Sequence, residues 1–101
     1  MTFEDKLTKL GITLPDPPAA VAAYQPWIRT GNLIFTSGQL PFSDGEIAYP
    51  GKLGAEVSVE DGYKAARQAA LNAIAQLKAA TGNLDKVQKI VRIEGYVHCA
   101  E

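Results

Sequence analysis

A short polar stretch directly follows an apolar run in the first half of the chain. Residues 33–35 read LIF, which is typical of a strand buried on both faces, and the next residues read TSGQ. A strand ending in Ser37 and Gly38 would hold a hydroxyl and backbone N–H groups in place, with room for close approach. That chemistry suits the carboxylate of a small ligand. Because Ser-Gly is also a common turn dipeptide, a simple strand end turning towards Pro41 is the alternative.

A tyrosine is predicted to lie beside this stretch. Residues 24–37 are expected to form a β-hairpin, because Thr30-Gly31-Asn32 is a tight-turn signal between two strand-like segments. The two ends of a hairpin meet, so Tyr24 is expected near Ser37. Its ring would wall the pocket or donate a hydrogen bond to a ligand, although packing is the commoner role of a tyrosine beside a turn.

A second polar row is predicted on a strand at about residues 88–99. One face of this strand would pack on a helix and consists of Val91, Ile93, Val97 and Cys99. The other face carries Arg92, Glu94, Tyr96 and His98. Arg92 and Glu94 either pair with each other or line a pocket; the alternative is a solvated or subunit-facing surface. His98 has no second histidine or cluster of carboxylates around it, so no metal site is predicted.

Composition limits the classes of function. The 101 residues suffice for one domain, and a net charge of −1 predicts no general attraction to nucleic acid or anionic membranes. There is no apolar run long enough to cross a bilayer and no signal-peptide pattern, so a soluble, cytoplasmic protein is expected. Cys99 is the single cysteine, which excludes an internal disulfide and a cysteine-based zinc site.

Two helices complete the predicted elements. Residues 1–11 form a short helix with Thr2 as its cap, and residues 12–20 are an extended connector because three prolines interrupt them. Residues 59–80 carry the strongest helical signal, with a cap at Ser58 and a stop at Gly82. The core-facing stripe of this helix is expected to be Ala66, Ala70, Ala73, Ile74 and Leu77.

The order of elements predicts an α+β fold. Residues 42–57 are read as a loop with a brief strand near residues 46–49, so the elements run strand, strand, helix, strand. This order favours an antiparallel sheet with helices packed on one face. The chain is expected to form one domain over residues 1–101, with residues 1–18 as an N-terminal helix and Pro-rich connector.

Two motifs resemble the Rid family (RidA/YjgF-like proteins, also described as endoribonuclease L-PSP). The first is the Ser-Gly-Gln-aliphatic-Pro string within GNLIFTSGQLP, at residues 31–41. The second is a helix ending in glycine and followed by a Leu-x-x-Val step into a strand, within residues 65–93. The resemblance covers roughly residues 19–101. The N-terminal helix and the GKLGAE loop look like those of a divergent subgroup.

The resemblance implies a chorismate-mutase-like fold that assembles as a homotrimer, with sites in clefts between subunits. The implied activity is hydrolysis of reactive enamines or imines, such as 2-aminoacrylate, to 2-keto acids and ammonia, without a metal or organic cofactor. Tyr24 would line the cleft, and Ser37 and Gly38 would bind the carboxylate end of the small-molecule substrate.

Two central family residues have no counterpart in the chain as far as Glu101. They are a carboxylate-binding arginine in an Arg-Ser motif and a water-positioning glutamate; Arg92 and Glu94 stand on a different element. The C-terminal part of the domain is therefore expected to be missing, through truncation, a separate chain or a shortened relative. Two alternatives to the deaminase stay open: a non-catalytic small-molecule-binding trimer, and an endoribonuclease or translation inhibitor, against which the near-neutral charge argues.

Overall fold

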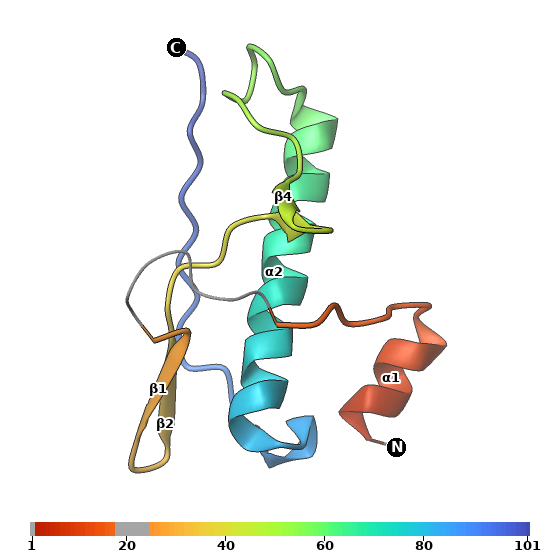
Figure 1. Ribbon diagram of the computed structural model, residues 1–101, viewed down its shortest axis with the longest axis vertical. Helices are drawn as coiled ribbons and strands as arrows, with labels where there is room; N and C mark the ends of the chain where they lie inside the picture. Colours follow the sequence, from red (N-terminus) through yellow and green to blue (C-terminus); the bar gives the residue numbers. More distant parts are fainter. Residues whose placement is uncertain (1, 18–24) are drawn as a thin grey trace.

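The computed structural model describes residues 2–17 and 25–101, and these fold around one long helix (Figure 1). The helices are α1 (Phe3–Lys9) and α2 (Val59–Thr81), followed by the 3-10 turn η1 (Leu84–Lys86). The strands form two antiparallel hairpins, β1 (Trp27–Thr30) with β2 (Leu33–Thr36), and β3 (Phe42–Ser43) with β4 (Glu46–Ile47). No helix in the described ranges is both long and apolar enough to cross a membrane.

The predicted first hairpin is confirmed over a shorter span. Thr30 pairs with Leu33, so Gly31 and Asn32 form a two-residue turn between β1 and β2. Gly31 has a φ of 56°, a left-handed conformation that glycine adopts without a steric penalty. Trp27 pairs with Thr36 at the open end of the hairpin.

The apolar run of β2 is more exposed than the sequence predicts. Leu33 keeps 46% of its surface accessible and Phe35 keeps 55%, so the prediction of a strand buried on both faces is wrong for this chain. Among the described elements, α2 is the only one outside the hairpin that contacts β1 or β2. Helix α2 covers one face of the β1–β2 hairpin, and the other face of the hairpin stays open.

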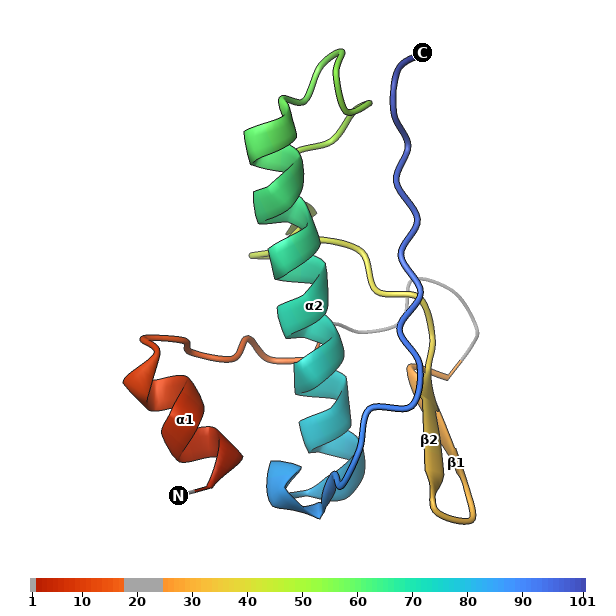
Figure 2. The same cartoon turned by 180° about the vertical axis from the view of Figure 1, so that it is seen from behind.

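The segment at residues 88–99, which the sequence predicts to be a strand, pairs with no strand among the described residues. The segment is extended and runs beside α2 without joining a ladder (Figure 2). It is held near its end by Leu53, whose N–H donates to the His98 carbonyl at 2.9 Å and whose carbonyl accepts from Ala100 N–H at 2.8 Å. Val91 and Ile93 are 73% and 84% exposed, so the predicted packing of their face on the helix does not occur. In the described residues no strand lies alongside to cover them.

Helix α2 begins and ends where the sequence predicts, but its predicted core-facing stripe is only partly buried, with Ala73, Ile74 and Leu77 half-buried. Ser58 Oγ accepts from Asp61 N–H at 3.1 Å, and Gly82 closes the helix with a left-handed φ of 76°. Ala66 and Ala70 of the predicted stripe are exposed. The most buried positions of the helix are Asn72, Ala75 and Gln76. Asn72 is buried although a hydrophobic pattern assigns it to solvent, because its side chain binds the chain packed against the helix.

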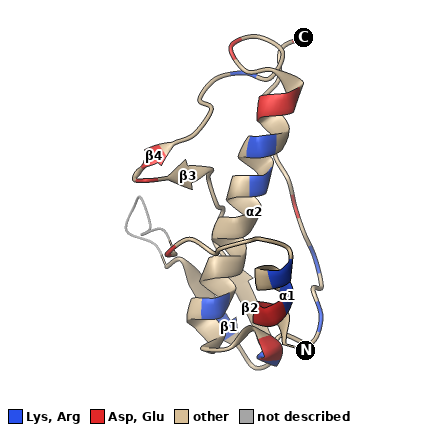
Figure 3. Ribbon diagram, turned by 90° about the vertical axis from the view of Figure 1, so that its right-hand side faces the viewer, with Lys and Arg blue, Asp and Glu red and all other residues tan. Residues whose placement is uncertain are grey.

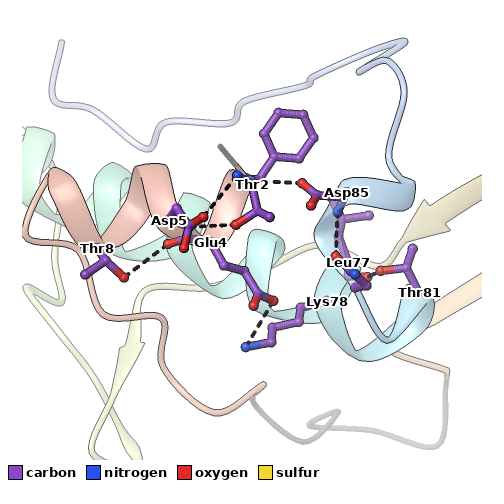
Figure 4. Close-up of polar contacts among 10 residues, drawn as sticks. Thr2, Glu4, Asp5, Thr8, Leu77, Lys78, Thr81 and Asp85 are labelled. Carbon is purple, nitrogen blue, oxygen red and sulfur yellow. Dashed lines mark hydrogen bonds and ion pairs between the residues drawn. The ribbon is translucent and has the colours of Figure 1, made fainter.

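The short helix α1 docks through polar contacts and has no buried residue (Figure 4). Thr2 and Asp5 form the predicted capping box. Phe3 N–H donates to Asp85 Oδ1 at 2.8 Å, and Lys78 Nζ lies 3.4 Å from Glu4 Oε1. These contacts tie the start of the chain to the C-terminal end of α2 and to η1.

The predicted loop at residues 42–57 contains a second hairpin. Asp44 and Gly45 form its two-residue turn, with φ values of 54° and 82°. Both residues are left-handed, as a type I′ turn requires, and Asp-Gly is a favoured pair for that turn. The brief strand predicted near residues 46–49 is thus present as β4, and β3 is its partner.

We expect Gly82→Ala to lower the free energy of unfolding by about 1 kcal/mol, because a side chain disfavours the left-handed φ at the helix end. An added Cβ would meet nothing within 4 Å, so the loss would report backbone conformation alone. Gly95→Ala is the matched control, since Gly95 also has open space and lies outside the left-handed region. Urea denaturation of both variants tests this; equal losses would contradict it.

Candidate ligand-binding site

Ser37 is fixed at the end of β2 by a single backbone carbonyl. Its N–H donates to the Pro26 carbonyl at 2.9 Å, and its hydroxyl donates to the same oxygen at 3.2 Å. The pairing of β1 with β2 therefore extends one residue beyond Thr36. The half-buried Ser37 Oγ is held in place and keeps its lone pairs as acceptors.

Gly38 presents open backbone directly after this hydroxyl. It is exposed, and a Cβ built on it would have no atom within 4 Å. Within residues 2–17 and 25–101, its N–H makes no hydrogen bond. Gln39 Nε2 donates to the Ser37 carbonyl at 3.1 Å, which stabilises the turn around the glycine. A ligand oxygen can therefore approach a free N–H beside a fixed hydroxyl.

A buried amide on α2 holds the chain that leaves Gly38. Asn72 is 0% exposed; its Nδ2 donates to the carbonyls of Leu40 at 2.9 Å and Phe42 at 3.1 Å. Its Oδ1 accepts from Gln68 Nε2 at 3.1 Å. Sequence reasoning missed this positioning residue, because an asparagine within an Ala-rich helix reads as solvent-facing. No local sequence signal marks it, because its two backbone partners lie thirty or more residues earlier in the chain.

The polar row near the C-terminus forms a separate surface cluster. Arg92 Nη2 lies 2.7 Å from Glu94 Oε1, and the Tyr96 hydroxyl donates to Glu94 Oε2 at 2.6 Å. Of the alternatives left open for Arg92 and Glu94, the structure shows the pairing, on an exposed and solvated surface. The hydrogen bond to the Glu94 carboxylate, with its negative charge, raises the pKa of Tyr96 above the ordinary value of 10.0. No hydrogen bond within the described part of the chain joins this cluster to Ser37 or Gly38.

The remaining predicted site features are quickly placed. Tyr24 lies outside the described residues. His98 contributes its backbone carbonyl to Leu53. The pKa of Glu56 is lowered mainly because its carboxylate accepts from Lys52 N–H at 2.9 Å. The described residues contain no group of three or more His, Cys, Asp or Glu side chains able to hold a metal ion.

Comparison with known proteins places this geometry in a family. The family model described as YjgF/chorismate mutase-like, putative endoribonuclease, matches residues 4–101. The chain belongs to this family. The predicted resemblance to Rid, or YjgF-like, proteins is therefore confirmed, and the matched region includes the whole of the Ser37–Gly38 segment.

Individual YjgF-like relatives agree. The chain is 38% identical over 92 residues to "Protein TCP17" of Trypanosoma cruzi, covering 91% of this chain and 58% of that protein. A crystal structure of a putative endoribonuclease from Shewanella oneidensis MR-1 matches with a TM-score of 0.84 and 44% identity, over 89% of this chain and 60% of that one. The Agrobacterium tumefaciens protein Atu1372, of unknown function, matches with a TM-score of 0.74 and 42% identity, over 86% and 53%.

These matches confirm the predicted α+β, YjgF-like fold. They also show that the chain spans between about half and three fifths of the length of these relatives.

We expect Asn72→Asp to lower the free energy of unfolding by at least about 2 kcal/mol at pH 7, because a carboxylate would face two carbonyl oxygens in place of a donor. The loss should shrink as the pH falls, since a protonated carboxyl can again donate. Urea denaturation at pH 7 and pH 4.5 measures both effects.

Asn83→Asp is the matched control. Asn83 Oδ1 accepts from Asp85 N–H at 2.9 Å, a role that a carboxylate oxygen can fill. A destabilisation of Asn72→Asp no larger than that of Asn83→Asp would show that the buried amide does not hold the loop.

We expect Tyr96 to ionise above pH 10, and Glu94→Gln to bring its titration back towards the ordinary range because the neutral amide no longer opposes a phenolate. The difference in absorbance at about 295 nm between the wild type and Tyr96→Phe isolates this group. An unchanged titration midpoint in Glu94→Gln would contradict the assigned cause.

Proposed function

We propose that the chain supplies the substrate-carboxylate end of a Rid-type enamine/imine deaminase, with Ser37 and Gly38 as binding residues and Tyr24 as a wall of the same pocket. The observation that carries the proposal is the N–H of Gly38, which makes no hydrogen bond within the described residues, beside the anchored hydroxyl of Ser37. Membership of the YjgF-like family supports it, because this segment lies within the matched region.

The proposed reaction needs little from the protein beyond positioning. 2-Aminoacrylate takes up a proton on its methylene carbon and becomes the imine, and water then adds to the carbon of the C=N bond. The C–N bond of the resulting carbinolamine breaks, ammonia leaves, and the 2-keto acid remains. The Gly38 N–H donates to the substrate carboxylate, and the Ser37 hydroxyl donates to it once its proton turns from the Pro26 carbonyl to the ligand. Holding the carboxylate with these two donors keeps the imine carbon at a fixed place for attack by water.

The proposed assembly is a homotrimer with its sites in clefts between subunits, as the family resemblance implies. In such a cleft a neighbouring subunit would cover the exposed Gly38, and excluding bulk water would strengthen the hydrogen bonds to the substrate. The reaction calls for no metal or organic cofactor. A soluble, cytoplasmic location is part of the same proposal.

Two other functions stay open for the same fold. A non-catalytic trimer would bind 2-keto acids in this cleft without turnover. The family description and the Shewanella structure also name an endoribonuclease. A net charge of −1 does not favour strong binding to RNA, whose affinity for proteins depends largely on neutralised phosphates.

We expect the full-length protein to accelerate ammonia release from 2-aminoacrylate generated in situ, and to sediment as a trimer. Ser37→Ala should raise KM by about tenfold with a smaller effect on kcat, because the hydroxyl binds the carboxylate in both the ground and transition states. Thr30→Val is the matched control, since it removes an exposed hydroxyl at the far end of the same hairpin.

No acceleration by a folded protein would contradict the deaminase. Binding of pyruvate without turnover, measured by calorimetry, would then favour the binding trimer. Cleavage of RNA that persists through repurification and is lost in Ser37→Ala would favour the endoribonuclease.

A further inference from the structure

A cavity lies on α2 apart from the Ser37–Gly38 segment. Its volume is about 310 Å³, and it opens between the β3–β4 hairpin and the N-terminal half of the helix. Its lining residues are Ser43, Ala48, Tyr49, Lys64, Arg67 and Gln68. Figure 3 shows basic residues of α2 at the level of β3 and β4, where this cavity lies. Its size matches the lower end of the range for small-molecule sites.

The cavity carries two cationic groups with little to neutralise them. Lys64 and Arg67 are one helical turn apart and so share a face of α2. Lys64 Nζ is 3.9 Å from Asp61 Oδ1, a loose pair between two half-exposed side chains. Arg67 makes no ion pair or hydrogen bond with any residue in the described ranges. No carboxylate belongs to the lining.

The opposite wall is held rigidly against the helix. Asn72 binds the Phe42 carbonyl at the start of the hairpin, and Ala48 N–H donates to the Pro41 carbonyl at 2.9 Å at its end. Tyr49 follows with a φ of 54°, a left-handed conformation that is uncommon for a bulky residue. This conformation places an aromatic ring on the cavity wall, with Ser43 supplying a hydroxyl beside it.

We propose that this cavity binds a small organic phosphate monoester. The Arg67 guanidinium offers paired N–H donors that match phosphate oxygens, and Lys64 adds a second positive charge for the dianion. The Ser43 hydroxyl donates to a third oxygen. The ring of Tyr49 contacts the organic part of the ligand, which explains a strained aromatic residue at this position. The site is independent of the proposed deaminase chemistry, because neither Ser37 nor Gly38 lines it.

Calorimetric titration of the full-length protein with phenyl phosphate, inorganic phosphate and acetate tests the proposal at fixed, low ionic strength. We expect phenyl phosphate to bind at millimolar concentration or tighter, inorganic phosphate more weakly, and acetate weakest. Arg67→Gln should weaken phenyl phosphate binding at least tenfold, and Lys64→Gln and Tyr49→Ala several-fold. These side chains are exposed, so the variants should keep the circular dichroism spectrum of the wild type.

Lys89→Gln is the matched control, because it removes the same charge from an exposed position outside the cavity. Equal weakening by Lys89→Gln and Arg67→Gln would reduce the effect to general electrostatics and overturn the proposal. So would an absence of phenyl phosphate binding, or acetate binding as tightly. A single-stranded RNA that competes with phenyl phosphate and binds more tightly would assign the cavity to nucleic acid instead. All of these outcomes are measured as ligand binding, so they do not depend on whether the protein releases ammonia from 2-aminoacrylate.

Discussion

The buried amide of Asn72 is the interaction on which the arrangement of this chain depends. It joins α2 to the carbonyls of Leu40 and Phe42, thirty or more residues earlier in the sequence. A single amide–carbonyl bond contributes only about 0.5–1.5 kcal/mol, but a buried carbonyl left without a donor costs more. The same contact positions two surfaces. Gly38 lies just before the fixed segment, and the hairpin that walls the cationic cavity lies just after it.

Local chemistry made much of the fold predictable. The turn at Gly31, the cap at Ser58 and the stop at Gly82 each depend on a few neighbouring residues, and the structure places all three as the sequence predicts. The Asp44-Gly45 pair carried an equally strong turn signal that the sequence interpretation passed over in favour of a loop. The family could be identified because two motifs, the Ser-Gly-Gln-aliphatic-Pro string and the helix stop with its Leu-x-x-Val step, occur in the family's order along the chain.

Burial could not be predicted in the same way, because it depends on what lies across from each face. The apolar run at residues 33–35 suggested cover on both sides, whereas α2 is its one partner among the described elements outside the hairpin. The helical stripe was only partly right, since Ala73, Ile74 and Leu77 are half-buried. Ala66 and Ala70 fit the hydrophobic period yet are exposed, while Asn72 and Gln76 break it and are buried. In the candidate site, the motif predicted Ser37 and Gly38 as binding residues. It did not predict Asn72, the helix residue that holds the chain following Gly38.

The attachment of the C-terminal segment has a consequence for how this chain opens. In the described part of the chain, residues 88–97 form no backbone hydrogen bonds, and Leu53 joins the segment through two bonds at His98 and Ala100. Breaking those two bonds would release the whole stretch, while the helix and both hairpins keep their own. Residues 88–100 should thus open as one unit, with slower amide exchange at Leu53 and Ala100 than throughout residues 88–97. The two hydrogen bonds of Leu53 are therefore the contacts that keep this segment closed.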